Sequence, residues 1–302
     1  MHDVDVTFFI DPGCPFGYSA WPALSALHWR FGDQLRWRTA MIGLAEDPAE
    51  YEAKGFDPLF LASSQLQFRE HGMPFSISVK DRLWATSLAC RTLIAVRLAW
   101  PERETGALRA LQFAQFCTPM LLDEPADLRR ALAAVPGIDA AVAVASAEDA
   151  RVWDVYEAER AEARSAGGSP AQAQGKTAGE RYTAPSLVFS AGDRRLEAGG
   201  FQPLAAYDVL LANLAPGLER RPAPEDPAEA LEAFPDGLTT AELALVMDSG
   251  GETERRLLER MAAGELEREP LGDGALWRLA RPTGRFRSLP GGRSTEILGM
   301  PR

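Results

Sequence analysis

Cys14 is the residue in this chain whose position best suits covalent chemistry. It follows a nearly all-apolar run at 6–10 and a breaker-rich turn at 11–13, and Pro15 suits the first position of a helix. The unpaired N–H groups and positive dipole end of a helix start favour an anion, and the thiolate is the nucleophilic form of cysteine. We therefore predict that Cys14 is an acidified nucleophile. The alternative is a small residue buried under a turn.

The other cysteines and the histidines predict packing rather than chemistry. Cys90 lies within a helical apolar pattern, where we expect it to pack in a core, and Cys117 ends a helix before a Thr-Pro pair. A remote resolving thiol at either position stays open, but no spacing requires one. His2, His28 and His71 are far apart in the sequence, so metal-ligand spacing is absent and no metal site is predicted.

The composition is that of a soluble globular protein and excludes several classes. The chain has 302 residues, enough for about two domains, and 46% of them are hydrophobic. Its formal charge of −11, from 32 basic and 43 acidic residues, argues against general polyanion binding. Three cysteines cannot form a disulfide scaffold. Because no signal peptide or membrane-spanning apolar run is visible, we expect a cytoplasmic, reduced protein without a membrane partner.

The sequence predicts three groups of elements that position Cys14. They are an N-terminal β-α-β unit, a helical block, and a β-β-α unit that completes the frame. From about residue 51 to 165 breakers thin out and helical spacing dominates, whereas the flanking segments contain short β-branched and aromatic runs. The pattern predicts strands at 4–11 and 35–44 around a helix at 15–31, then a hairpin at 186–190 and 195–198 and a closing helix at 203–214.

A Pro-rich, charged linker at 220–227 marks a domain boundary. Beyond it the pattern predicts three short helices and a hairpin, with a Thr-Thr-Ala-Glu capping box at 239–242. This order resembles a winged-helix domain over residues 225–302. Its third helix, 252–260, carries three arginines offset by three glutamates, so it lacks a clear phosphate-binding face. We expect this domain to contact a protein or to dimerise. DNA contact and the oligomeric state both stay open, and the arginines after residue 280 could add a basic tail.

The segment FFIDPGCPFGYSAWPALSAL resembles the first strand, active-site turn and helix of the DsbA-like branch of the thioredoxin superfamily. The pattern is closest to cytoplasmic FrnE-type proteins and 2-hydroxychromene-2-carboxylate isomerases. Members of this branch typically have a D-x-x-C-P-W-C turn. The run Thr183-Ala184-Pro185-Ser186 resembles the family's cis-proline loop, which faces the reactive cysteine, and residues 199–214 resemble its last strand and helix. The resemblance covers roughly residues 4–215.

The resemblance implies an α/β, thioredoxin-like fold with an inserted helical domain over residues 1–220. The small winged-helix-like α+β domain follows it on the separate evidence of its own element order. The resemblance also implies that Cys14 is the catalytic residue. The active-site turn that it implies consists of Pro15, Phe16 and Gly17. The substrate-binding residues are then Thr183, Ala184 and Pro185, together with Tyr18, which could line an apolar pocket beside the sulfur.

Gly17 stands where the family has a second cysteine, and this departure leaves three mechanisms. In the first, Cys14 attacks a small or protein disulfide, and a low-molecular-weight thiol completes the cycle as a cosubstrate, without a bound cofactor. In the second, a thiol-cofactor-dependent isomerase or transferase uses Cys14 as a polar or nucleophilic group. In the third, a retired catalytic site is kept for binding. We expect the first, a cytoplasmic DsbA/FrnE-type thiol-disulfide oxidoreductase; a redox- or ligand-responsive regulator that contacts DNA or a protein is a further alternative.

Overall fold

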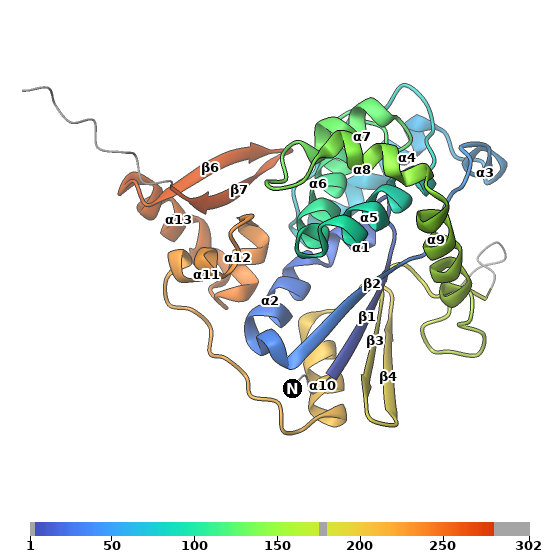
Figure 1. Cartoon of the computed structure of the whole chain (residues 1–302). Coiled ribbons are helices and arrows are strands. Elements are labelled where there is room, and N and C mark those ends of the chain that lie inside the picture. The colour runs from blue at the N-terminus through green and yellow to red at the C-terminus, as the bar shows by residue number, and fades with distance from the viewer. Residues whose placement is uncertain (1–3, 175–179, 281–302) are drawn as a thin grey trace, which may run out of the picture.

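A four-stranded mixed sheet forms the centre of the frame, in the order β2-β1-β3-β4 (Figure 1). The computed structural model describes residues 4–174 and 180–280. β1 pairs in parallel with β2 and antiparallel with β3, and β3 pairs antiparallel with β4. The strands are β1 (Val4–Ile10), β2 (Leu35–Met41), β3 (Ser186–Ala191) and β4 (Arg194–Gly199).

The alternating side chains of β1 feed two hydrophobic cores, one on each face of the sheet. Val6, Phe8 and Ile10 belong to the large core, which also contains buried residues of the helices α2 (Trp21–Phe31) and α10 (Leu204–Leu214). Phe9 points to the other face and stacks on Tyr182 with ring centroids 4.3 Å apart. Because β1 is buried on both faces, its run of apolar residues is the pattern expected of a central strand.

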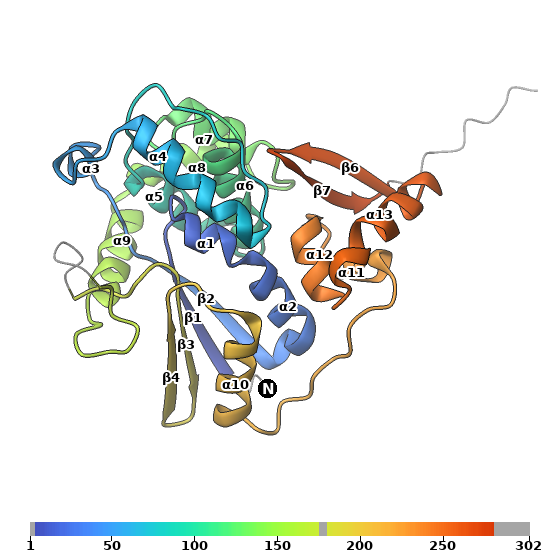
Figure 2. The same cartoon turned by 180° about the vertical axis from the view of Figure 1, so that it is seen from behind.

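The first helix of the frame is broken in two, which differs from the single helix predicted at 15–31. α1 (Pro15–Ser19) ends at Ala20, and α2 begins at Trp21. Pro22, near the start of α2, cannot donate an N–H and its ring clashes with the carbonyl four residues earlier, so a continuous helix is disfavoured. The break leaves α1 as a short separate helix between the sheet and the helical layer (Figure 2).

A layer of helices lies between β2 and β3 in the sequence and covers the end of the sheet where α1 lies (Figures 1 and 2). Residues 81–86 lie within the predicted helical block but form no helix, and the Thr86 N–H bonds the Ala45 carbonyl at 2.9 Å. The helices are α3 (Ala49–Ala53), α4 (Pro58–Gln65), the 3-10 helix η2 (Leu66–His71), α5 (Ser87–Ala99), α6 (Glu104–Cys117), α7 (Pro125–Leu132), α8 (Ala140–Ala145) and α9 (Ala150–Ala163).

After the linker, three helices and a three-stranded sheet of order β5-β7-β6 form a separate C-terminal unit. The predicted capping box is confirmed, because Thr239 and Glu242 exchange hydrogen bonds at the start of α12. The predicted tail, 281–302, lies outside the described residues. The elements are α11 (Pro227–Ala233), β5 (Leu238–Thr239), α12 (Thr240–Val246), α13 (Thr253–Ala262), β6 (Leu266–Leu271) and β7 (Gly274–Leu279).

The C-terminal unit is docked on the frame through a buried ion pair. Glu242 on α12 is fully buried and pairs with both terminal nitrogens of Arg109 on α6. The same carboxylate accepts from the Ser25 hydroxyl on α2 at 2.8 Å, and the Arg109 guanidinium lies over the Trp21 ring. Because every oxygen of this buried carboxylate has donors, the C-terminal unit is held in one position against α2 and α6.

Candidate active site

Cys14 is the N-cap residue of α1, at the junction between β1 and the helix that the sequence predicts. Its backbone is extended, with φ −84° and ψ 114°, and Pro15 takes the first helical position. The Gly17 N–H donates to Cys14 Sγ at 3.4 Å, and the Tyr18 N–H donates to the Cys14 carbonyl at 3.0 Å. The cysteine thus satisfies the first orphan donors of the helix with its own sulfur and carbonyl.

The Thr183-Ala184-Pro185 loop lies against this sulfur. Cys14 Sγ donates to the Ala184 carbonyl at 3.2 Å, and the Ala184–Pro185 peptide bond is cis. The loop is fixed on both sides, because the Thr183 N–H bonds the Ala171 carbonyl and the Gly200 N–H bonds the Pro185 carbonyl. Residues 170 positions apart are therefore brought together as the sequence predicts, with an accepting backbone carbonyl beside the thiol.

Asp11 is a buried acid beside the site that sequence reasoning did not select. Its carboxylate accepts from the Gly13 N–H, the Leu44 N–H and the Thr86 hydroxyl, each at 2.7 Å. Burial raises its pKa, although these hydrogen bonds oppose the rise. The signal available in the sequence was an acid directly after a buried strand and before a breaker-rich turn. Asp11 holds that turn against α5 and the loop after β2.

The thiol is not acidified, so the expectation of an acidic Cys14 is wrong for this structure. Its pKa is raised to about 12, chiefly because burial disfavours the thiolate, and the charge of Asp11 adds to the effect. Hydrogen bonds from the Gly17 and Phe16 N–H groups and the charge of Arg181 act in the opposite direction but do not overcome burial. Only 4% of Cys14 is exposed, and this desolvation outweighs the favourable helix start.

Gly17 is the place where a second cysteine would stand, and the neighbouring core fills it. A Cβ built on Gly17 would lie 3.6 Å from the Cβ of Cys14, within the range that disulfides adopt. The same Cβ would lie only 2.0 Å from Cδ1 of Ile10, a fully buried side chain. The backbone therefore keeps the geometry of a two-cysteine turn, whereas the packing is that of a one-cysteine turn.

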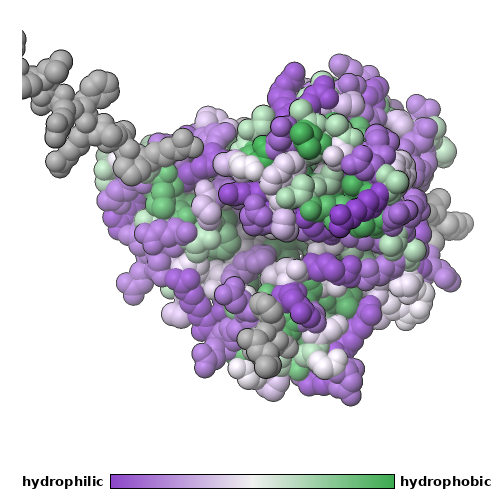
Figure 3. Space-filling model, viewed as in Figure 1, coloured by the Kyte–Doolittle hydropathy of each residue, from purple (hydrophilic) through white to green (hydrophobic). Residues whose placement is uncertain are grey.

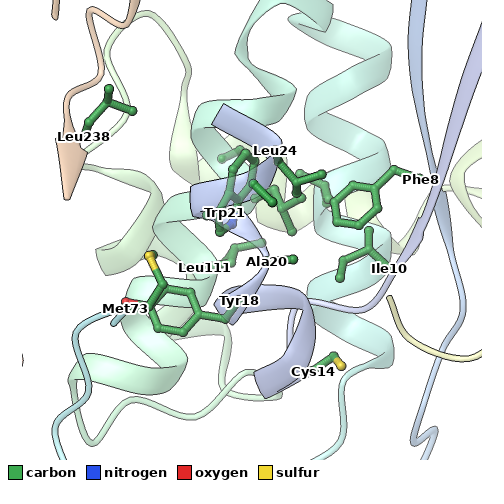
Figure 4. Packing of buried hydrophobic residues seen from close by; sticks show 14 of the residues in the cluster. Phe8, Ile10, Cys14, Tyr18, Ala20, Trp21, Leu24, Met73, Leu111 and Leu238 are labelled. Atoms are coloured by element: carbon green, nitrogen blue, oxygen red, sulfur yellow. The ribbon is translucent and has the colours of Figure 1, made fainter. Parts of the chain in front are cut away.

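Tyr18 does not face the sulfur, which corrects its predicted role as a substrate-binding residue. It is fully buried, its hydroxyl donates to the Pro74 carbonyl at 2.8 Å, and its ring stacks on Phe116. Figure 4 shows Tyr18 beside Met73 on one side of α1 and Cys14 at the start of the helix. The contacts with Pro74 and Phe116 hold the Tyr18 side chain in the large core rather than beside the sulfur.

Phe16 is the turn residue that stays at the surface. It is 42% exposed, and its ring contacts Phe68 of η2 edge-on with centroids 4.7 Å apart. Pro15 is half-buried and Gly17 is buried. An exposed aromatic ring two residues from the thiol gives the turn an apolar rim that a ligand can contact.

Cys90 and Cys117 both have free thiols in protein contacts. Cys90 is fully buried on α5, as predicted, and its sulfur lies 3.6 Å from Asp11 Oδ2. Cys117 ends α6, donates to the Pro74 carbonyl at 3.2 Å and lies 3.5 Å from the Tyr18 hydroxyl. Burial raises the pKa of both thiols, so neither is prepared for attack in this arrangement.

Two further polar groups near Cys14 come from segments that sequence reasoning passed over. Arg181 precedes the cis-proline loop and donates to the Tyr182 carbonyl at 2.8 Å. Burial lowers its pKa, and the charges of Cys14 and Asp11 oppose that effect. The Tyr51 phenol on α3 has a raised pKa, first from burial and then from the charges of Asp11 and Cys14. The thiol therefore lies in a small polar surrounding of mixed charge.

A cavity elsewhere does not include the thiol. It has a volume of about 930 Å³ and lies between the end of α2, the start of α6 and β5, where the face in Figure 3 is hollowed near its centre. Within residues 4–174 and 180–280, no group of three or more His, Cys, Asp or Glu side chains is arranged to hold a metal. No helix in the same residues is long and apolar enough to cross a membrane.

No family model matches this sequence, and no curated protein does. Solved structures do match. A protein disulfide isomerase candidate from Nitrosomonas europaea has a TM-score of 0.56 and 19% identity, with 70% of this chain and 97% of that chain covered. The cytosolic disulfide reductase DsbM from Pseudomonas aeruginosa has a TM-score of 0.51 and 16% identity, covering 69% of this chain and 99% of its own. A DsbA oxidoreductase candidate from Streptomyces coelicolor has a TM-score of 0.52 and 17% identity over 70% of this chain and 89% of its own.

The fold is DsbA-like. This confirms the thioredoxin-like fold that the resemblance of the turn and the cis-proline loop implies. Because the Nitrosomonas and Pseudomonas structures are matched over nearly their full length, the part of this DsbA-like chain outside the match has no counterpart in them.

Proposed function

We propose that this DsbA-like protein is a thiol-disulfide oxidoreductase that works through the single thiol of Cys14. The observation that carries the proposal is the Cys14 sulfur at the N-cap of α1, 3.2 Å from the Ala184 carbonyl before the cis-proline, with the second-cysteine position closed by Ile10. An extended ligand with a disulfide could pair with this loop and present its sulfur to Cys14.

The proposed reaction has two exchange steps. The Cys14 thiolate attacks one sulfur of R–S–S–R′, forming Cys14–S–S–R and releasing R′–S⁻, which takes up a proton. A second thiolate, R″–S⁻, then attacks the R sulfur, releases the Cys14 thiolate and forms R–S–S–R″. The external thiol thus removes the mixed disulfide in place of a resolving cysteine, but it attacks the R sulfur and leaves Cys14 reduced. A low-molecular-weight thiol fits this role, and the Pseudomonas DsbM structure has also been solved with GSH.

The Cys14 thiol is closed, in the sense that its sulfur is buried against the Ala184 carbonyl, and it must be uncovered before it can attack. With 4% of its surface exposed and a pKa of about 12, Cys14 is protonated and shielded at neutral pH. Displacement of the Ala184 carbonyl from the sulfur, with the Gly17 N–H retained, would favour the thiolate, because only the donor would stay in contact. A ligand that pairs with the loop would supply this displacement.

Mass spectrometry after exposure to oxidised glutathione tests the proposal. We expect one glutathione adduct on Cys14, its removal by reduced glutathione, and no adduct in Cys14→Ser. An internal Cys14–Cys90 or Cys14–Cys117 disulfide would contradict the one-thiol mechanism. Catalysis of thiol addition or isomerisation without an adduct on Cys14 would favour the isomerase or transferase alternative.

We also propose the finer assignments of domain, branch and location. The first is a DsbA-like domain over residues 1–220, of the FrnE type, with a helical insert at about 51–165. The second is a winged-helix-like domain over 225–302, supported by the order helix, strand, two helices and hairpin from α11 to β7. A cytoplasmic location is supported by the likeness to a disulfide reductase described as cytosolic.

The DNA-contact alternative finds little support in α13. Two of its three arginines are engaged, since Arg255 pairs with Glu252 and Glu259, and Arg260 pairs with Asp226 and Glu265. Arginines that are already paired offer less charge to phosphates. We therefore propose that this domain acts through contacts with the rest of its own chain rather than with DNA.

A further inference from the structure

The turn between β6 and β7 contacts a loop of the helical layer, backbone against backbone. The Asp273 N–H donates to the Phe75 carbonyl at 3.0 Å, and Asp273 Oδ1 accepts from the Phe75 N–H at 2.7 Å. Arg69 pairs with the other carboxylate oxygen at 3.0 Å. The approach is close, because a Cβ on Gly272 would lie 2.8–3.1 Å from backbone atoms of Phe75. Asp273 is therefore the clamp between the C-terminal unit and residues 73–75.

Residues 73–75 in turn pack against α1. The Pro74 carbonyl accepts from the Tyr18 hydroxyl, and the Phe75 ring contacts the Tyr18 ring edge-on at 5.2 Å. Phe75 also stacks on Phe68, whose ring contacts Phe16. Residues 73–75 therefore contact Tyr18 of α1 directly. They reach Phe16 of the same helix through Phe68.

A helix of five residues has few internal hydrogen bonds and depends on its packing for a fixed position. The Gly17 N–H reaches the Cys14 sulfur only while α1 stays in register with the N-cap. If residues 73–75 shift, α1 loses its Tyr18 hydroxyl acceptor, and the Cys14 thiol loses its closed geometry.

We propose that Asp273 is a positioning residue for Cys14, which holds residues 73–75 against α1 and so keeps the thiol closed. The C-terminal unit thereby sets the reactivity of a site on another domain. This inference rests on the proposed function only for the reaction that the thiol performs. The buried Arg109–Glu242 pair holds the body of the unit independently, so loss of the clamp does not detach the unit.

The test measures the rate at which bis(2-hydroxyethyl) disulfide, a neutral probe, modifies Cys14 in the full chain, followed by mass spectrometry of the Cys14 peptide. We expect Asp273→Ala to raise this rate about fivefold, the effect of one lost hydrogen bond, and to move its pH profile to lower pH. Asp273→Asn keeps the acceptor for the Phe75 N–H and should stay within about twofold of the wild type. Asp273 is 41% exposed at its side chain, so both variants should fold.

Thr240→Val is the matched control. It removes the acceptor of the Trp277 indole, 2.9 Å away, and so weakens the C-terminal unit without touching residues 73–75. Wild-type rates in Asp273→Ala, or an equal rise in Thr240→Val, would overturn the inference. Glutathione turnover by the same proteins tests the proposed function separately, since labelling of Cys14 does not require turnover.

Discussion

At the scale of single residues, the site combines a reactive position with an unreactive resting state. The helix start and the Gly17 N–H favour a thiolate, but burial and Asp11 raise the pKa of Cys14 to about 12. Sequence reasoning could place Cys14 because the strand, the turn and the helix start form a local pattern, whereas the cis-proline loop came from the family resemblance. It could not give the pKa, because burial depends on residues such as Ala184, which is 170 positions away.

The pH dependence of Cys14 modification follows from its raised pKa. Since thiolate is the attacking form, we expect the rate with a neutral disulfide to rise nearly tenfold per pH unit between about pH 7 and 10. Cys14→Ser provides the background from Cys90 and Cys117. A rate that levels off near pH 7 would mean an acidic thiol and would contradict the closed state.

Gly17→Cys should restore a two-cysteine turn only when Ile10 is shortened. The single variant should lose about 1–3 kcal/mol of unfolding free energy, because its Cβ overlaps Cδ1 of Ile10. Ile10→Val deletes that carbon, so the double variant should regain much of the loss and form a disulfide between Cys14 and the introduced thiol. Denaturant unfolding and thiol counting check this, with Ile10→Val alone as the control. Full stability of Gly17→Cys by itself would disprove the packing argument.

At the scale of elements, the structure depends on contacts between segments that are remote in sequence. Periodicity predicted the frame strands and the later helices, and the Thr239–Glu242 capping box is a local signal that the sequence carries. Pro22 is the one residue in the sequence that explains the break between α1 and α2. The break was not predicted because the apolar residues on both sides keep helical spacing. The direction of Tyr18 was not predictable, because it is set by Pro74 and Phe116.

The buried pair between α6 and α12 should be the most sensitive contact between the C-terminal unit and the rest of the chain. Glu242→Gln leaves the Arg109 charge buried without a carboxylate, and we expect it to lower the unfolding free energy by about 3–5 kcal/mol. Burial opposes the charge of Glu242, yet Arg109 and its other donors hold its pKa below the usual value. This contribution is therefore present above about pH 4.3 and is lost as pH falls. Glu252→Gln, in an exposed pair with Arg255, is the control and should change little in the same denaturant unfolding measurement.

At the scale of the whole molecule, the C-terminal unit has its hairpin turn and α12 occupied by the rest of the chain. The turn is held by Phe75 and the helix by Arg109, so two surfaces of the unit are buried within the protein. The net charge of −11 adds a general repulsion toward nucleic acid. The expectation from composition stays a prediction, and the docking itself needed the coordinates of both units.

We expect the full chain to show no shift of duplex DNA in an electrophoretic assay, even at low salt. The physical reason is that the third helix has two of its three arginines in ion pairs, on a protein of negative net charge. A salt-dependent shift would contradict this and would support the regulator alternative. Glu259→Gln removes one of the two ion-pair partners of Arg255. This variant shows whether the assay can detect the added positive charge.

The four donors to the Asp11 carboxylate have a consequence for how the site comes into being during folding. They lie 2, 33, 75 and 79 positions away, on the turn itself, the loop after β2, and the start of α5. Contacts of such separation form late, because long loops must close first. Until these contacts and the cis-proline loop are in place, the Cys14 thiol is solvated and more reactive than in the folded protein. The rate at which Cys14 is modified during refolding therefore reports how fast the helical layer packs onto the sheet.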